Sequence, residues 1–143
     1  MLDRMLIEIE SNRTIYDALF KDCDIDELLD MRDDKEFDSE WIRVYHVLNK
    51  AKIEHYEKKK IDQIREKSFL KVYNLLQSSE IASCVSDDFE IICKAYIICY
   101  DDVWINSLIM SYINEKFPCG RLERTNYNIK ECINKLCKNK SIG

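Results

Sequence analysis

The most apolar part of the sequence runs from Phe89 to Phe117 and reads FEIICKAYIICYDDVWINSLIMSYINEKF. Apolar residues recur in it at steps of three and four, the spacing of one helical face, and they also fill the other side before Asp101. A helix that is apolar nearly all round is usually buried inside a bundle. Asp101 and Asp102 interrupt the run, and Pro118 ends it. We therefore predict two helices that form a buried hairpin.

The composition extends this prediction to the whole chain. The sequence has 143 residues, of which only 2 are glycine and 1 is proline. These fractions are far below the usual ~7% and ~5%, and strand-rich folds need both residues at their turns. The length suits one domain with one core. We predict an all-α, single-domain helical bundle over residues 1–143, with about five to seven helices around the hairpin and Tyr96 and Trp104 as its apolar anchors.

Capping patterns predict where the helices before the hairpin begin. Asp24 with Glu27 has the spacing of a capping box and predicts a short helix. Asp38 is predicted to cap a helix from Ser39 to Leu76, a stretch without glycine or proline. Its apolar stripe loses phase near Lys59, which leaves two alternatives: one long kinked helix, or two helices that meet near Lys59.

Similar signals predict the later helices. Asp87 is expected to cap the central helix, and Asp101 or Asp102 to cap the one after it. A last helix is expected from about Asn126 to Lys138. The tail, Asn139 to Gly143, is expected to be frayed.

No motif in the sequence indicates a reaction, a metal or a cofactor. The sequence has no C-x-x-C and no H-E-x-x-H, and its two histidines, His46 and His55, are too far apart to share a metal on one helical turn. Gly120 and Gly143 cannot build a phosphate-binding loop. Cys119 follows a proline in a loop, but no neighbouring base marks it as a nucleophile. We predict a protein that is not an enzyme and that needs no cofactor or metal.

The seven cysteines indicate reduced thiols rather than disulfides. Their number is odd and several fall on apolar helix faces, where a thiol acts as a small apolar group. The N-terminus shows no signal peptide, and no apolar run approaches the ~20 residues of a membrane span. We therefore expect a soluble cytoplasmic protein without a membrane contact and without a structural disulfide.

Charge is unevenly distributed along the chain, although the net charge is only −5. The segment Asp22 to Glu40 is strongly acidic, whereas Trp41 to Leu76 is basic and contains the run Lys58 to Lys60. That run is a weak pointer to nucleic acid in a chain with a pI of about 5.1, and we predict no nucleic-acid binding. The acidic segment is either a solvated, cap-rich connector or a negative surface for a basic partner. The candidate partner-binding residues are Asp24, Asp26, Glu27, Asp30, Asp33, Asp34 and Glu36.

Part of the sequence resembles a known class of proteins. Residues 86–90 (SDDFE), the helix through Tyr100, residues 101–108 (DDVWINSL), Tyr112 and residues 116–118 (KFP) resemble the helical hairpin of small bacterial immunity proteins. Those proteins accompany secreted or contact-delivered toxins. The resemblance implies a cytosolic protein that binds and blocks one toxin and has no catalysis of its own. We expect a monomer or homodimer. It transfers no toxin-contacting residue to this sequence. The alternative is a helical scaffold or adaptor that self-associates through Trp41 to Leu76.

Overall fold

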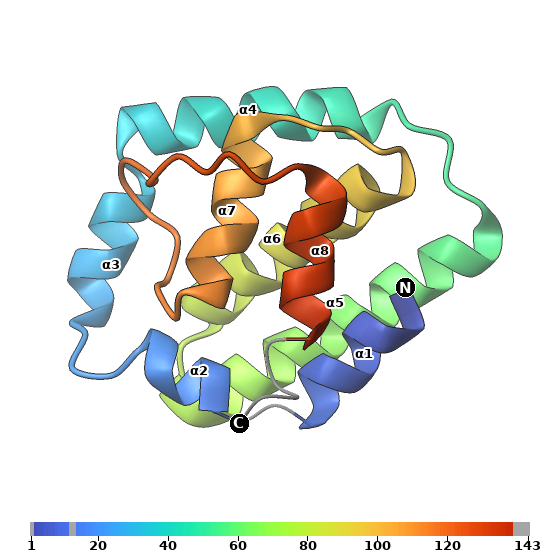
Figure 1. Ribbon diagram of the computed structural model, residues 1–143. Helices are drawn as coiled ribbons and strands as arrows, with labels where there is room; N and C mark the ends of the chain where they lie inside the picture. Colours follow the sequence, from blue (N-terminus) through green and yellow to red (C-terminus); the bar gives the residue numbers. More distant parts are fainter. Residues whose placement is uncertain (1, 12–13, 139–143) are drawn as a thin grey trace.

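A computed structural model describes residues 2–11 and 14–138 of the protein. The described residues form eight helices and no strand (Figure 1). The helices are α1 (Leu2–Ser11), α2 (Thr14–Leu19), α3 (Ile25–Arg32), α4 (Lys35–Asn49), α5 (His55–Leu76), α6 (Ser79–Ile97), α7 (Val103–Ile113) and α8 (Ile129–Lys138). The predicted all-α bundle is confirmed, with one helix more than the expected range. The prediction for the tail, Asn139 to Gly143, concerns residues outside those described.

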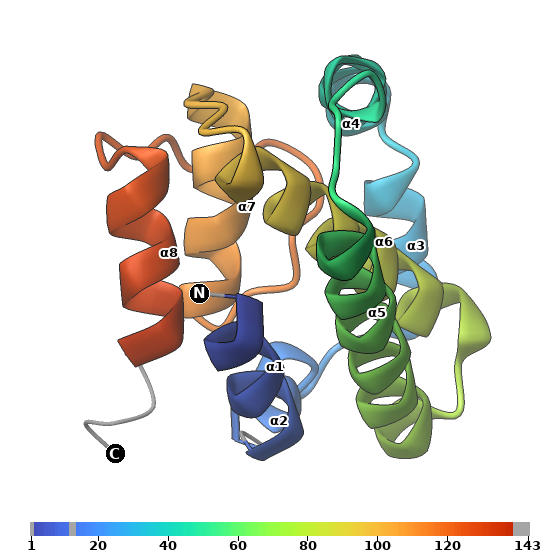
Figure 2. The same ribbon diagram turned by 90° about the vertical axis from the view of Figure 1, so that its right-hand side faces the viewer.

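The bundle is arranged around α6. Helices α5 and α6 form the most extensive packing pair, α1 packs on α5, and α8 packs on α7. Figure 2 shows α8 and α5 on opposite sides of the molecule, with α7 between them and α6 running behind α5 toward α7. Helix α4 crosses the end of this assembly, and α3 lies at its edge (Figure 1). None of the described helices combines the length and the apolar character needed to cross a membrane.

The central helix starts earlier than the capping pattern predicts. Helix α6 begins at Ser79, and the Ser78 hydroxyl caps it by accepting a hydrogen bond from the Ile81 N–H at 3.2 Å. The prediction that Asp87 caps this helix is therefore wrong, because Asp87 and its neighbour Asp88 lie inside α6. The predicted hairpin is present as α6 and α7. Its first helix, however, packs more extensively on α5 than on α7.

The expected helix from Ser39 to Leu76 is two helices. Helix α4 ends at Asn49 and α5 begins at His55, so the break lies at residues 50–54 and not near Lys59. The Glu54 N–H donates to the Glu57 carboxylate at 3.0 Å, an arrangement that starts a helix without glycine or proline.

The cap of α4 also differs from the prediction. The Asp34 carboxylate accepts from the Glu36 N–H at 3.2 Å, and the Asp34 carbonyl accepts from the Asp38 N–H at 2.9 Å. Asp38 therefore lies in the first turn of α4, where its charge favours the helix dipole, and it is not the cap. The predictions for Asp24 and Asp102 are confirmed. Asp24 caps α3, and Asp102 caps α7 by accepting from the Ile105 N–H.

The largest fully buried side chains are those of Tyr112 and Phe37. The predicted anchors, Tyr96 and Trp104, are only partly buried against the core. Trp104 lies in the first turn of α7, where its ring packs edge-on against Phe37 with centroids 5.3 Å apart. The sequence correctly indicated that these residues contact the core, but it overestimated how deeply they are buried.

All seven cysteine thiols are free, and three of them, Cys93, Cys132 and Cys137, are buried. Burial raises the pKa of the Cys132 thiol to about 11 and raises the pKa of Cys93 further. The Cys132 thiol also donates to the Asn106 carbonyl at 3.7 Å. These groups are therefore held in their neutral forms in the folded protein.

We expect the protein to lose stability above about pH 8.5, the ordinary pKa of an unfolded thiol. A group whose pKa is raised by folding keeps its proton more tightly when folded. The contribution of such a group to the stability of the fold is therefore complete below its pKa in the unfolded state. This contribution is lost as the pH rises toward its pKa in the folded state. For Cys132 this window ends at about pH 11. Urea midpoints measured from pH 7 to 11 should fall more gently in Cys132→Ala than in the native protein. The exposed-site variant Cys23→Ala should keep the native slope, and equal slopes in all three proteins would contradict the assignment.

Candidate functional site

Helix α3 exposes a row of carboxylates and contributes no fully buried side chain to the core. The Asp24 carboxylate caps it by accepting from the Asp26 N–H at 3.0 Å and the Glu27 N–H at 3.4 Å. All seven predicted partner-binding residues are exposed, along α3 and the start of α4. We call them the acidic surface: Asp24, Asp26, Glu27, Asp30, Asp33, Asp34 and Glu36.

A buried ion pair holds this helix to the bundle. The Arg32 guanidinium, at the end of α3, reaches inward and donates to both oxygens of the Asp88 carboxylate, at 2.5 and 2.8 Å. The Asp88 side chain has no solvent exposure and that of Arg32 is 9% exposed. Arg32 is the polar connection of α3 to the interior, and the partly buried Ile25, Leu28 and Leu29 add apolar contacts to the core.

The two charges of this pair are fully surrounded by hydrogen-bonding groups. Asp88 also accepts from the Trp41 indole N–H at 2.9 Å and from the Tyr112 hydroxyl at 2.6 Å. Arg32 donates in addition to the Pro118 carbonyl at 3.0 Å. These hydrogen bonds make the buried ion pair tolerable, because removing charges from water costs several kcal/mol per ion. The cluster joins α3, α4, α6 and α7 at one point.

The pKa values in this cluster reflect the effects of burial and of the neighbouring charges. Burial alone would lower the pKa of Arg32, but the Asp88 carboxylate more than offsets this effect, and the pKa is raised above its usual value. Burial first, and then the neighbouring Asp88, raise the pKa of Tyr112 well above its usual range. Arg32 is therefore a permanent cation and Tyr112 a permanent donor.

Reasoning from the sequence missed this cluster. The cap expected at Asp87 placed Asp88 in the first turn of a helix, and Arg32 fell within the charged segment Asp22 to Glu40. One signal was present: Asp88 follows Val85 by three residues and precedes Ile92 by four, so a carboxylate occupies a position on the apolar stripe of α6. A charge at such a position requires a buried partner.

The segment between α7 and α8 folds back beside α3 (Figure 1). The Gly120 N–H donates to the Met31 carbonyl at 3.1 Å, and Gly120 has a φ of +62°, a conformation that glycine adopts without strain. This contact lies at the border of an open hollow of about 480 Å³, which we call the acidic hollow. It is lined by Glu27, Asp30, Met31, Asp33, Asp34, Glu36, Gly120 and Arg121.

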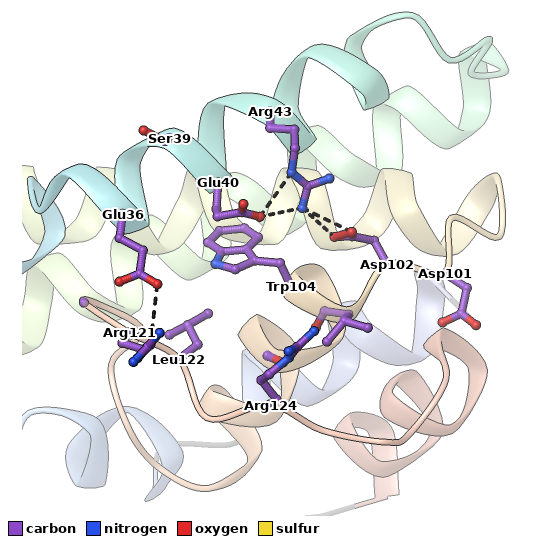
Figure 3. Close-up of a pocket in the computed structure, with 13 residues that line it drawn as sticks. Glu36, Ser39, Glu40, Arg43, Asp101, Asp102, Trp104, Arg121, Leu122 and Arg124 are labelled. Carbon is purple, nitrogen blue, oxygen red and sulfur yellow. Dashed lines mark hydrogen bonds and ion pairs between the residues drawn. The ribbon is translucent and has the colours of Figure 1, made fainter.

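A second hollow, of about 690 Å³, lies on the other side of Glu36 and Arg121 (Figure 3). We call it the tryptophan hollow, because the ring of Trp104 lies between α4 and the segment that carries Arg121. On its α4 side, the Arg43 guanidinium bridges the Glu40 carboxylate at 2.6 Å and the Asp102 carboxylate at 3.1 Å.

The two hollows share Glu36, Gly120 and Arg121 as lining residues and are adjoining parts of one surface region. Carboxylates outnumber bases in it, since its only basic residues are Arg43, Arg121 and Arg124. Within the described residues, no group of three His, Cys, Asp or Glu side chains is arranged to hold a metal ion. The arrangement is suited to forming ion pairs with a basic surface.

Comparison with known protein families identifies the class of this protein. The chain matches the family model of immunity protein PIM1 over residues 4–119. This match covers most of the sequence, including the acidic surface, the Arg32–Asp88 pair and the helices α6 and α7. The chain belongs to this family and is an immunity protein, which confirms the resemblance noted in the sequence and implies a toxin as its protein partner. No curated protein matches the sequence.

Proposed function

We propose that this immunity protein neutralises its cognate toxin by binding it through the acidic surface, without catalysis. The observation that supports this role is the exposure of all seven carboxylates on one stretch of the bundle. Arg32, which the sequence places among them, is turned into the core and neutralised by Asp88. The surface is therefore more negative than the sequence count suggests, with Lys35 and Arg121 as its nearest exposed bases.

The proposed mechanism is electrostatic occupation of a basic site on the toxin. Complementary charge speeds association and confers specificity. A toxin that acts on nucleic acid needs a basic cleft for phosphates, and clustered carboxylates are able to occupy such a cleft in place of the substrate. One copy of the chain carries the whole acidic surface, so a monomer is sufficient, and we place the encounter in the cytoplasm.

The alternative function, a self-associating scaffold, has weaker support. On α5, Tyr56 is 68% exposed, and Leu70, Tyr73 and Leu75 are 43%, 37% and 41% exposed. Exposed apolar side chains of this number are normal on monomeric proteins. The family match also favours a toxin as partner over a second copy of the chain.

Charge reversal tests the proposal. We expect Asp30→Lys combined with Asp33→Lys to slow association with the cognate toxin domain at least ~10-fold at low salt, and to flatten the dependence of the rate on salt. Both residues are exposed, and neither side chain accepts a helix-capping hydrogen bond, so the fold should persist. Stopped-flow binding at several salt concentrations provides the measurement.

The matched control is Asp62→Lys with Glu66→Lys, two exposed acids of α5 that line neither hollow. It changes the net charge by the same amount at a different place. If both double variants associate at the same rate with the same salt dependence, the acidic surface is only solvated and the proposal is wrong.

A further inference from the structure

We propose that the tryptophan hollow receives a basic side chain of the toxin, an arginine or lysine that lies on the Trp104 ring. This inference rests on the proposed function and extends it, because it names the chemical group that the partner inserts and the place where that group binds. The acidic surface would attract the toxin over a distance, whereas the hollow would hold one of its side chains.

The aromatic ring is fixed in position before any partner arrives. Trp104 is only partly buried, and its ring packs on that of Phe37, a fully buried residue of α4, with an angle of 63° between the rings. The rest of the indole lines the hollow beside Leu122 (Figure 3). A tryptophan face is the best aromatic site for a cation, and the attraction grows when the site is partly shielded from water.

Two carboxylates beside the ring keep unused acceptors. Arg43 contacts one oxygen of Glu40, and Arg121 contacts one oxygen of Glu36 at 3.5 Å. The other oxygen of each carboxylate accepts no hydrogen bond from the residues that the structure describes. The charge of Arg43 is further balanced by Asp102. The hollow therefore offers negative potential and free acceptors on the α4 side of an aromatic surface.

The Glu36–Arg121 contact is the part of the hollow that a partner would rearrange. Arg121 is 84% exposed and Glu36 is 58% exposed, and ion pairs of this kind contribute little to stability. A cation from the toxin would replace Arg121 at Glu36 with little loss. Because Glu36 and Arg121 line both hollows, the same toxin segment would contact the acidic surface and the Trp104 ring.

The occupant is expected to be a cation and not an anion. Of the three arginines in the hollow, Arg43 and Arg121 are already paired with carboxylates of the chain. Arg124 alone makes no hydrogen bond or ion pair among the described residues, and four acids, Glu36, Glu40, Asp101 and Asp102, face these three bases.

The two tryptophan side chains provide a direct test by NMR. The Trp41 indole N–H is bound to Asp88 away from the hollow, so its resonance serves as an internal control. Adding the cognate toxin domain to the ¹⁵N-labelled protein should shift the Trp104 indole resonance and leave that of Trp41 in place. Binding that leaves Trp104 unshifted would overturn the inference.

Variants then test the chemistry of the occupant. Trp104→Leu should weaken toxin binding about 3- to 30-fold, and Trp104→Phe should weaken it less, because phenylalanine keeps an aromatic face. Glu36→Gln combined with Glu40→Gln should also weaken binding, while Asp62→Asn combined with Glu66→Gln should not. An unshifted Trp41 resonance confirms that each variant is folded. If Trp104→Leu weakens binding but the Glu36 and Glu40 variant does not, the occupant is apolar and the inference is wrong.

The outcomes separate this inference from the proposed function. Toxin binding that is slowed by Asp30→Lys and Asp33→Lys but is indifferent to Trp104→Leu would refute the hollow and leave the acidic surface in place. Toxin binding that is indifferent to both changes, or no binding at all, would refute both.

Discussion

Replacing Asp88 with asparagine is expected to lower the free energy of unfolding by about 3–5 kcal/mol, the usual cost of breaking a buried ion pair by removing one partner. The substitution keeps the volume of the side chain. It removes the negative charge that balances Arg32 and places an NH2 group where an oxygen had accepted hydrogen bonds. All three partner side chains of Asp88, those of Arg32, Trp41 and Tyr112, are donors, so the new donor would face donors. Urea unfolding followed by circular dichroism measures the change.

The neighbouring residue provides the control. Asp87 is only partly buried and pairs with Arg65 on the surface of α5 at 2.6 Å, an arrangement usually worth less than about 1 kcal/mol. Asp87→Asn should therefore change the free energy of unfolding little. Equal effects at positions 87 and 88 would show that the buried cluster does not stabilise the fold.

A double-mutant cycle tests whether Arg32 and Asp88 act as one unit. Arg32→Met should also be strongly destabilising, because it leaves the Asp88 carboxylate buried without its cation. The double variant should cost less than the sum of the two single variants, since both remove the same interaction. Strict additivity would contradict the pairing.

The second large effect is expected at Phe37. Phe37→Ala should lower the free energy of unfolding by about 3–5 kcal/mol, the usual range for truncating a buried phenylalanine. This side chain is 1% exposed, contacts the ring of Trp104 and lies under the Arg32 guanidinium at 4.6 Å. Its removal would therefore leave a cavity beside the buried ion pair.

Trp104→Ala is the comparison for this prediction. The sequence suggests that Trp104, as the larger residue, anchors the core, whereas the structure places it at the edge of a hollow. Trp104→Ala should therefore cost less than Phe37→Ala when both are measured by chemical unfolding. The reverse order would show that the partly exposed indole contributes more to the core than its burial implies.

Much of the fold could be predicted from local signals. The scarcity of glycine and proline and the helical spacing of apolar residues indicated an all-α bundle, and the caps at Asp24 and Asp102 were correct because a cap is a contact between near neighbours. The signals failed at Asp87 because an acid followed by a glutamate at three residues also occurs inside helices. They failed at residues 50–54 because a capping box needs no breaker residue.

The site was predictable only in part. The exposure of the acidic residues followed from their charge, since isolated carboxylates stay in water. The hollows did not follow, because they depend on contacts between distant parts of the chain, such as Gly120 on Met31 and Arg43 on Asp102. The pairing of Arg32 with Asp88, separated by 56 positions, is a contact of the same kind.

The absence of fully buried side chains in α3 has a consequence for evolution. A helix whose apolar residues are only partly buried is free to change its exposed positions while the domain beneath it continues to fold. Arg32 and the partly buried Ile25, Leu28 and Leu29 tie it to the interior, so selection for folding acts on those residues and leaves the acids beside them open to exchange. If the toxin binds the acidic surface, as we propose, substitutions at the exposed positions of this eight-residue helix would let the immunity protein follow a toxin whose surface drifts, without repeating the evolution of its core.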